Sequence, residues 1–534
     1  MKRLAGPFAL CILATLCIVA APSHYTKKVA AVCPTCPPPP PPPPAVGMFG
    51  GPLQGLSSSI TSLFNGGYGT YTIKWDPIRG LGPVSTRAGC FTCHGAGTDV
   101  LTGTAGDTSN ITGTRFGKWN TDGTFNYLDG TGTSPENEGG PVLHGITNAA
   151  FKTLPNCSQM TIASNGATES GTTVTITTTA NHGFKVGQEV QVLNVPVSGY
   201  NGQFAVVSVP NSTTFTYTAA TSGLKTSGGG IAQNLPHEVT PSDATVVNLV
   251  RSPQLFGFGL IDNISDSDIL ANAAKSPGFN IPKGVANMVP DESDVTRPGK
   301  FGQKLDAVSL FQFNANAEFN ELGITTNAGP FGVASMFNPN EHLPQGLSYP
   351  TACQPDTNSP QDVSQLNMIK MTQFIALLAP IPEQPPTSAS TAGETVFDNI
   401  GCSACHIKSY TTQQNVTLRT TTGGKTTVIP SLSNVTFSPY SDFLLHDMGS
   451  GDSGGIPFQP HGLGQAKLTQ WRTAPLWGLA NMLAKAGGLM HDNASTSIDA
   501  AVRRHGGDAA TVITSYKGLN STDSANLLAF LKSL

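Results

Sequence analysis

Residues 401–406, Gly401-Cys402-Ser403-Ala404-Cys405-His406, decide how the rest of this 534-residue chain is interpreted. The same Cys-x-x-Cys-His pattern recurs upstream as Cys90-Phe91-Thr92-Cys93-His94. Two thiols three positions apart reach the two vinyl groups on one edge of a porphyrin, and the imidazole that follows lies beneath the iron as its proximal ligand. The alternative interpretation of either copy is a zinc site or a redox Cys-x-x-Cys pair. Two copies predict two covalently bound c-type haems, attached through Cys90, Cys93, Cys402 and Cys405 and ligated by His94 and His406.

Length and composition set the broad class of the protein. A chain of 534 residues is too long for one hydrophobic core and indicates three or four compact units. Charged residues make up only 12%, with 59 glycines and 41 prolines, so we expect much loop wrapped around cofactors rather than long amphipathic helices. The net charge of −4 excludes a strongly basic surface, and no nucleic-acid partner is expected.

The N-terminal segment is expected to export the protein. Met1–Ala21 combines two basic residues with an uncharged apolar run, as in a signal peptide or an uncleaved anchor. Residues 22–47 form a Pro-rich linker, in which the eight consecutive prolines of Pro37–Pro44 form a stiff polyproline II rod. Because c-type haem is attached on the oxidising side of the membrane, we expect a periplasmic or cell-surface protein. If the N-terminal segment is not cleaved, it would tether the protein to the membrane.

Four cysteines outside the leader and the two motifs are unassigned. Cys33 and Cys36 lie in the linker, where a structural disulfide is favoured over a redox pair or an intermolecular link. Cys157 and Cys353 form a second candidate pair.

The remaining sequence predicts a mainly α fold with much irregular loop, built as two cytochrome c-like haem domains plus a small inserted all-β domain. The N-terminal haem domain would be discontinuous, with residues 48–157 and 235–385, and little regular structure is signalled before residue 157. The insert, residues 158–234, has short runs of β-branched residues separated by turn signals. Residues 386–534 would form the C-terminal haem domain.

Several helices are predicted individually. Ser265 is a candidate N-cap for a helix over Asp266–Ala274, and residues 362–378 form an apolar helix. In the C-terminal domain, helices over Thr391–Ile400 and Ser524–Leu534 flank the motif region, with Gly393 admitting a close crossing. A further helix is expected from Ile498 to His505.

A set of segments resembles the bacterial di-haem oxidoreductase family, described as peroxidases or thiol oxidoreductases and related to di-haem cytochrome c peroxidases. They are Gly401–His406, Ser441–Gly449, Trp471–Leu479, Met490–Asp492 and Leu527–Leu534. The chain departs from the family at Gln303, where a tryptophan is usual, and at Asn493, where a glycine is usual. The missing tryptophan removes a possible electron relay between the haems.

The resemblance implies roles for residues outside the two motifs. Met448 would be the sixth ligand of the C-terminal iron, with His446 as the rival ligand and packing against the porphyrin as the non-ligand alternative. Arg472 would anchor a propionate or a loop. The N-terminal haem would be the reactive one, with His144 and Glu318 as candidates for its distal acid/base. The alternative for His144 is a loop residue that makes a backbone hydrogen bond, and the alternative for Glu318 is a surface or structural carboxylate.

The function expected on these grounds is the reduction of hydrogen peroxide. A small exported donor, a cytochrome c or a cupredoxin, would deliver electrons to the C-terminal haem, which passes them to the N-terminal haem. Two alternatives stay open: a di-haem oxidase or oxygenase acting on an external substrate, and a non-catalytic electron-transfer cytochrome.

Overall fold

The computed structural model describes residues 45, 48–75, 84–85, 87, 89–96, 103–109, 112–119, 121, 125–126, 146–147, 159–184, 186, 189–219, 221–234, 245–322, 324, 364–449 and 469–534. The predicted leader, almost all of the Pro-rich linker, His144, Cys157 and Cys353 lie outside these residues. Within them, no helix has the length and apolar character needed to cross a membrane.

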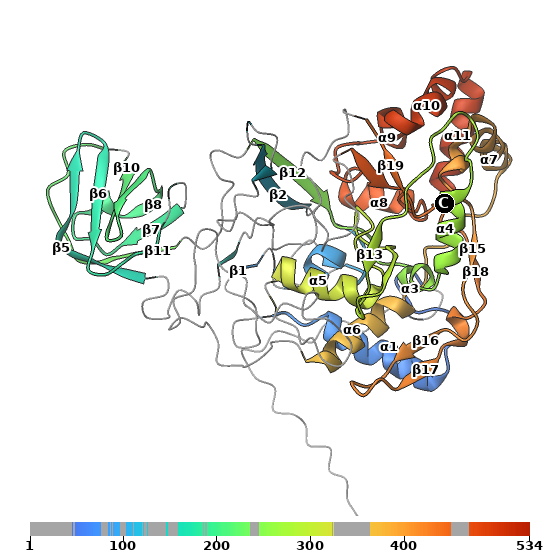
Figure 1. Ribbon diagram of the computed structural model, residues 1–534, viewed down its shortest axis with the longest axis horizontal. Helices are drawn as coiled ribbons and strands as arrows, with labels where there is room; N and C mark the ends of the chain where they lie inside the picture. The colour runs from blue at the N-terminus through green and yellow to red at the C-terminus, as the bar shows by residue number, and fades with distance from the viewer. Residues whose placement is uncertain are drawn as a thin grey trace, which may run out of the picture. The chain divides into compact units, whose positions relative to one another are not determined.

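The prediction of a mainly α, cytochrome-like fold is wrong. In the described part of the chain, ten α-helices accompany one seven-stranded sheet, one three-stranded sheet and five two-stranded sheets (Figure 1). Most of the small sheets pair strands of only two or three residues, too short to show any periodicity in the sequence. They form because backbone N–H and C=O groups in loops that lie against a core need hydrogen-bond partners, and a neighbouring loop provides them.

The small sheets lie in segments that were predicted to be loops or helical domains. The three-stranded sheet and the five pairs are β12 (Val246–Arg251) with β2 (Thr112–Trp119) and β3 (Phe125–Asn126), β1 (Val84–Ser85) with β4 (Ile146–Thr147), β13 (Met288–Pro290) with β14 (Thr296–Pro298), β15 (Tyr410–Thr411) with β18 (Thr436–Phe437), β16 (Thr417–Arg419) with β17 (Thr426–Val428), and β19 (Leu445–Asp447) with β20 (Gln470–Arg472). All of these pairs are antiparallel.

The seven-stranded sheet occupies the segment predicted as the β insert. Its order is β8-β7-β11-β5-β6-β10-β9, and its strands are β5 (Gln159–Ser170), β6 (Thr173–Thr178), β7 (Glu189–Leu193), β8 (Gly202–Ala205), β9 (Ser208–Asn211), β10 (Thr214–Thr218) and β11 (Ile231–Asn234). Phe204 of β8 stacks on Tyr217 of β10 with ring centroids 3.9 Å apart, so the sheet curls until distant strands touch. Its buried residues form a hydrophobic core of their own.

A helix that the sequence did not reveal begins the first haem-bearing region. α1 (Ser58–Tyr71) packs along α6 (Gln365–Leu377), where Phe64, Tyr68 and Tyr71 surround Phe374 with ring centroids 4.8–5.4 Å away. Three glycines in α1 lower its helix propensity, which explains why it was missed. One of them, Gly67, is required by the packing, because a Cβ there would lie 2.2 Å from the Lys370 carbonyl oxygen.

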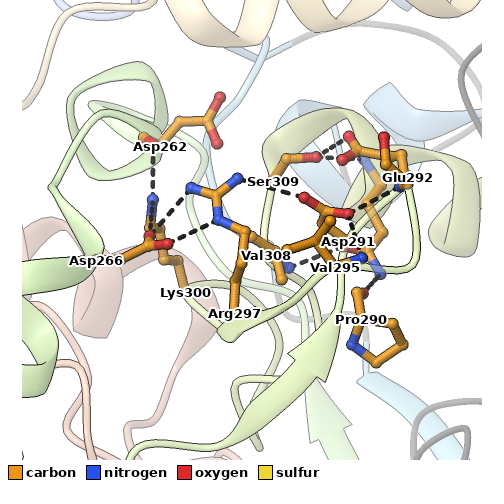
Figure 2. Close-up of polar contacts among 12 residues, drawn as sticks. Asp262, Asp266, Pro290, Asp291, Glu292, Val295, Arg297, Lys300, Val308 and Ser309 are labelled. Carbon is orange, nitrogen blue, oxygen red and sulfur yellow. Dashed lines mark hydrogen bonds and ion pairs between the residues drawn. The ribbon is translucent and has the colours of Figure 1, made fainter.

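A network of charged side chains fixes the segment between α3 (Phe258–Asp262) and α5 (Leu310–Leu322) (Figure 2). α4 (Asp266–Ala274) starts at the predicted cap, with the Ser265 hydroxyl accepting from the Asp268 N–H. Asp266 pairs with Arg297 at 2.7 Å and with Lys300 at 3.6 Å. Burial raises the pKa of Asp262 to about 6, and its carboxylate accepts from the first N–H of α5 at 2.9 Å. The network therefore fixes the start of the helix that carries Glu318.

The C-terminal region contains the predicted helix crossing. α7 (Ser388–Ile400) and α11 (Ser521–Ser533) meet at Gly393, where a Cβ would lie 2.0 Å from the Asn526 carbonyl oxygen. Phe397 packs edge to face on Phe530 at 5.3 Å. The other helices here are α8 (Leu479–Ala486), α9 (Ile498–Arg504) and α10 (Ala510–Lys517).

Candidate functional site

The first Cys-x-x-Cys-His motif lines a cavity of about 260 Å³. Cys90, Cys93 and His94 all border it. His94 Nδ1 lies 2.7 Å from the carbonyl oxygen of Pro253, and burial lowers the pKa of His94 to about 4. The neutral ring must donate Nδ1–H to this carbonyl, because a carbonyl oxygen can only accept. The lone pair is therefore on Nε2, as in a metal-ligating histidine whose other nitrogen is held by a backbone acceptor.

The second motif lines a separate cavity of about 200 Å³ and repeats this arrangement. Gly401 ends α7 in the left-handed conformation with φ 95°, which turns the chain so that Cys402, Cys405 and His406 border the cavity. His406 Nδ1 lies 2.9 Å from the Tyr440 carbonyl oxygen, and burial lowers its pKa to about 4. Both motif histidines thus have the same tautomer, with Nε2 available to a metal.

Glu318 on α5 lies in the wall of the first cavity, not on the surface. Its side chain is buried, and burial raises its pKa to about 8. In the described structure, Glu318 Oε2 has no hydrogen-bond partner. A buried carboxyl group without a partner stays protonated at neutral pH and can give up a proton to a molecule in the cavity. The other proposed distal residue, His144, lies outside the described residues.

Two arginines line both cavities, the buried Arg251 and the half-buried Arg472, and the sequence singled out only Arg472. Burial lowers the pKa of Arg472 to about 10, an effect that Asp306 opposes. Burial and the nearby Arg472 lower the pKa of Arg251 to about 10. Arg251 Nη1 and Arg472 Nε are buried without a hydrogen-bond partner among the described atoms. Buried guanidinium N–H groups favour carboxylate partners, so these residues fit the propionates of haems in both cavities.

The two residues predicted to compete for the C-terminal iron differ in their surroundings. Met448 is partly buried and lines the second cavity. Its role as an iron ligand stays a prediction. His446 Nε2 lies 2.8 Å from Asp442, and its Nδ1 lies 3.8 Å from Asp508 and 3.9 Å from Cys405 Sγ. Burial lowers the pKa of His446, but the hydrogen bonds and charges of Asp442 and Cys405 together outweigh burial and raise it to about 10. The ring is therefore held between two carboxylates and the second motif cysteine.

The position where the family has a tryptophan holds Gln303, which lines both cavities. A different aromatic pair borders the second cavity: Trp471 of β20 stacks on His491 with ring centroids 3.6 Å apart and planes 8° apart. The Lys304 ammonium lies 3.5 Å from the centre of the Trp471 ring. Both residues lie in segments that carry the family resemblance, but their contact was not predicted, because it joins two separate segments of the chain.

Comparison with known families bears on the part of the chain that carries the second motif. Residues 232–534, more than half of the chain, match the family model "Di-haem oxidoreductase, putative peroxidase". The chain belongs to the di-haem oxidoreductase family. The sequence resemblance is therefore confirmed, and the family implies two haems in this protein.

Other comparisons of this di-haem oxidoreductase add little. No curated protein matches the chain. The hydrazine synthase of Kuenenia stuttgartiensis, solved under 20 bar of xenon, is 16% identical over 33% of this chain with a TM-score of 0.21, and the match spans 58% of the synthase chain. The endosialidase of phage phi92 is 28% identical over 18% of this chain and 13% of its own, with a TM-score of 0.11.

Proposed function

We propose that this di-haem oxidoreductase is an exported peroxidase. It takes electrons at the C-terminal haem from a small exported cytochrome c or cupredoxin and reduces hydrogen peroxide at the N-terminal haem. The observation that carries this proposal is the N-terminal cavity, where the imidazole of His94 and the buried, protonated carboxyl of Glu318 border one space.

Covalent c-type attachment is part of the proposal. Cys90 and Cys93 would hold one haem and Cys402 and Cys405 the other, each through thioether bonds. His94 and His406 are the iron ligands, since the backbone carbonyls of Pro253 and Tyr440 leave Nε2 of each ring to the metal. When bound, each haem supplies an iron that exchanges single electrons.

Glu318 supplies the proton chemistry. Reduction of one hydrogen peroxide to two waters consumes two electrons and two protons, and cleavage of the O–O bond requires a proton on the departing oxygen. With a pKa of about 8, Glu318 holds a proton at neutral pH and can donate it to a molecule in the cavity that it lines. The carboxylate left behind is costly in this buried position, so it takes up a new proton before the next turnover.

The short separation of the two cavities supports electron transfer between them. Arg251, Gln303 and Arg472 line both, so a single layer of side chains separates the haem sites. The stacked pair of Trp471 and His491 borders the second cavity and offers an aromatic route that does not need the missing family tryptophan.

The test is turnover of peroxide by protein with a verified content of two haems. We expect peroxide-dependent oxidation of a reduced cytochrome c, cupredoxin or dye donor. The absence of such oxidation with every donor contradicts the proposal. Stable dioxygen binding by the reduced protein would then support an oxygenase, and two six-coordinate, low-spin irons in every redox state would support an electron-transfer cytochrome.

A further inference from the structure

The imidazole of His505 lies close to the motif histidine in the C-terminal cavity. The ring centroids of His505 and His406 are 6.5 Å apart, with 57° between the ring planes. When two imidazoles bind one iron from opposite sides, each metal–nitrogen bond is about 2.0 Å long and each Nε2 lies about 1.1 Å from the centre of its ring. The two ring centres are then about 6.2 Å apart. The observed separation matches the spacing of two imidazoles that share one iron.

The sequence around His505 directs its ring into this cavity. α9 starts at the Ser497 cap, and His505 follows its last residue, one helical turn beyond Ala501. Ile498, Ala501 and Val502 line the cavity together with His505, because residues three and four apart lie on one face of a helix.

A hydrogen bond also fixes the tautomer of His505. Its Nδ1 lies 2.8 Å from the carbonyl oxygen of Ala501. In the neutral ring Nδ1–H donates to this carbonyl, and the lone pair is on Nε2. His406 is held in the same way by Tyr440. Both imidazoles therefore carry the tautomer that binds a metal through Nε2.

The other histidines at this cavity are engaged differently. His446 is ion-paired with Asp442. The ring of His491 lies flat against Trp471, and its Nε2 is 3.5 Å from an Arg504 nitrogen. In the described part of the chain, Nδ1 donates to a backbone carbonyl in neither of these rings, whereas it does so in His406 and His505.

We propose that His505, in place of the Met448 predicted from the sequence, is the sixth ligand of the C-terminal haem iron, opposite His406. The inference rests on the proposed attachment of a c-type haem to Cys402 and Cys405. Two imidazole ligands close this iron to peroxide and restrict it to electron transfer. They also give it a lower reduction potential than a His/Met pair would, since a thioether ligand stabilises the reduced iron.

The test compares His505→Ala with Met448→Leu and His446→Gln in the full chain. Haem content is measured first by the pyridine haemochrome assay. In the wild type we expect a low-spin C-terminal haem whose near-infrared magnetic circular dichroism shows two nitrogen ligands and no methionine–iron band. In His505→Ala that haem becomes high-spin, and added imidazole restores the low-spin signal. Met448→Leu and His446→Gln keep the wild-type C-terminal spectrum.

The outcomes separate this inference from the proposed function. A wild-type protein without covalent haem overturns both. Two attached haems together with a methionine–iron band that disappears in Met448→Leu overturn the assignment of His505 alone. The same holds if His505→Ala retains both haems and leaves the low-spin spectrum unchanged. Restoration by imidazole shows that the variant is folded and has lost only the ligand.

Discussion

The two haem sites share a pentapeptide pattern and a histidine tautomer, but the walls opposite the motifs differ. The N-terminal cavity is bordered by strand β2, by loops and by helices α5 and α6, and His94 is the one histidine among the described residues that line it. The buried acid Glu318 also lines this cavity. The C-terminal cavity is bordered by α7 to α11 and contains further histidines and methionines. Under the proposed function, the motif would place an iron, and the remaining wall of each cavity would decide whether that iron reacts or only transfers electrons.

Removal of one attachment motif at a time gives the largest expected effect. Cys90→Ser with Cys93→Ser, and separately Cys402→Ser with Cys405→Ser, should each leave one haem of two, because the thioether bonds cannot form. We expect both to abolish peroxide turnover, while only the first variant still accepts electrons from the donor. Pyridine haemochrome assays and stopped-flow reduction measure this. Retention of two haems in either variant would contradict the assignment of the motifs.

Substitution of Glu318→Gln tests the reactive wall. The amide keeps the shape of the side chain but cannot deliver a proton, so peroxide turnover should fall by about 10²–10⁴-fold with two haems retained. Steady-state kinetics with a reduced donor provides the measurement. Glu321→Gln, at another carboxylate that lines the same cavity, is the matched control and should have a much smaller effect. Equal losses in the two variants would argue against a specific role for Glu318.

The raised pKa of Glu318 also predicts a pH dependence of stability. Between about 4.5 and 8 the unfolded chain loses the Glu318 proton while the folded protein keeps it. The unfolded state then binds fewer protons, so the free energy of unfolding should decrease with rising pH across this window, by a few kcal/mol at most. Denaturant titrations of the holoprotein measure it. The Glu318→Gln variant should lose this part of the slope, and an unchanged slope would show that the carboxyl is ionised in the folded state.

The helix crossing of the C-terminal site gives the smallest effect. Gly393→Ala places a Cβ 2.0 Å from the Asn526 carbonyl oxygen, so α7 and α11 must move apart, at a cost of about 1–3 kcal/mol. Thermal unfolding followed at the haem absorbance provides the measurement. Gly69→Ala is the control, because nothing lies within 4 Å of a Cβ at that position of α1 and helix propensity favours alanine. A Gly393→Ala protein as stable as wild type would show that the crossing has room for a methyl group.

Local signals in the sequence were sufficient for several elements of the fold. The β-branched runs of residues 172–218 predicted strands of the seven-stranded sheet, and Ser265 predicted the start of α4. Local signals failed where packing overrides propensity, as in the glycine-rich α1. They also failed for the two- and three-residue strands, whose existence depends on a partner elsewhere in the chain.

By itself, the sequence determined the prediction of two haem sites and of their proximal histidines, because the porphyrin dictates a fixed spacing of cysteines and histidine that is contained in five consecutive residues. Only the tertiary structure decided what faces each iron. Glu318, Arg251 and His505 come from segments far from the motifs, and long-range packing of helices and strands brings them to the cavity walls. Burial then changes their chemistry, raising the pKa of Glu318 and leaving Arg251 in need of an anion, which no local pattern encodes.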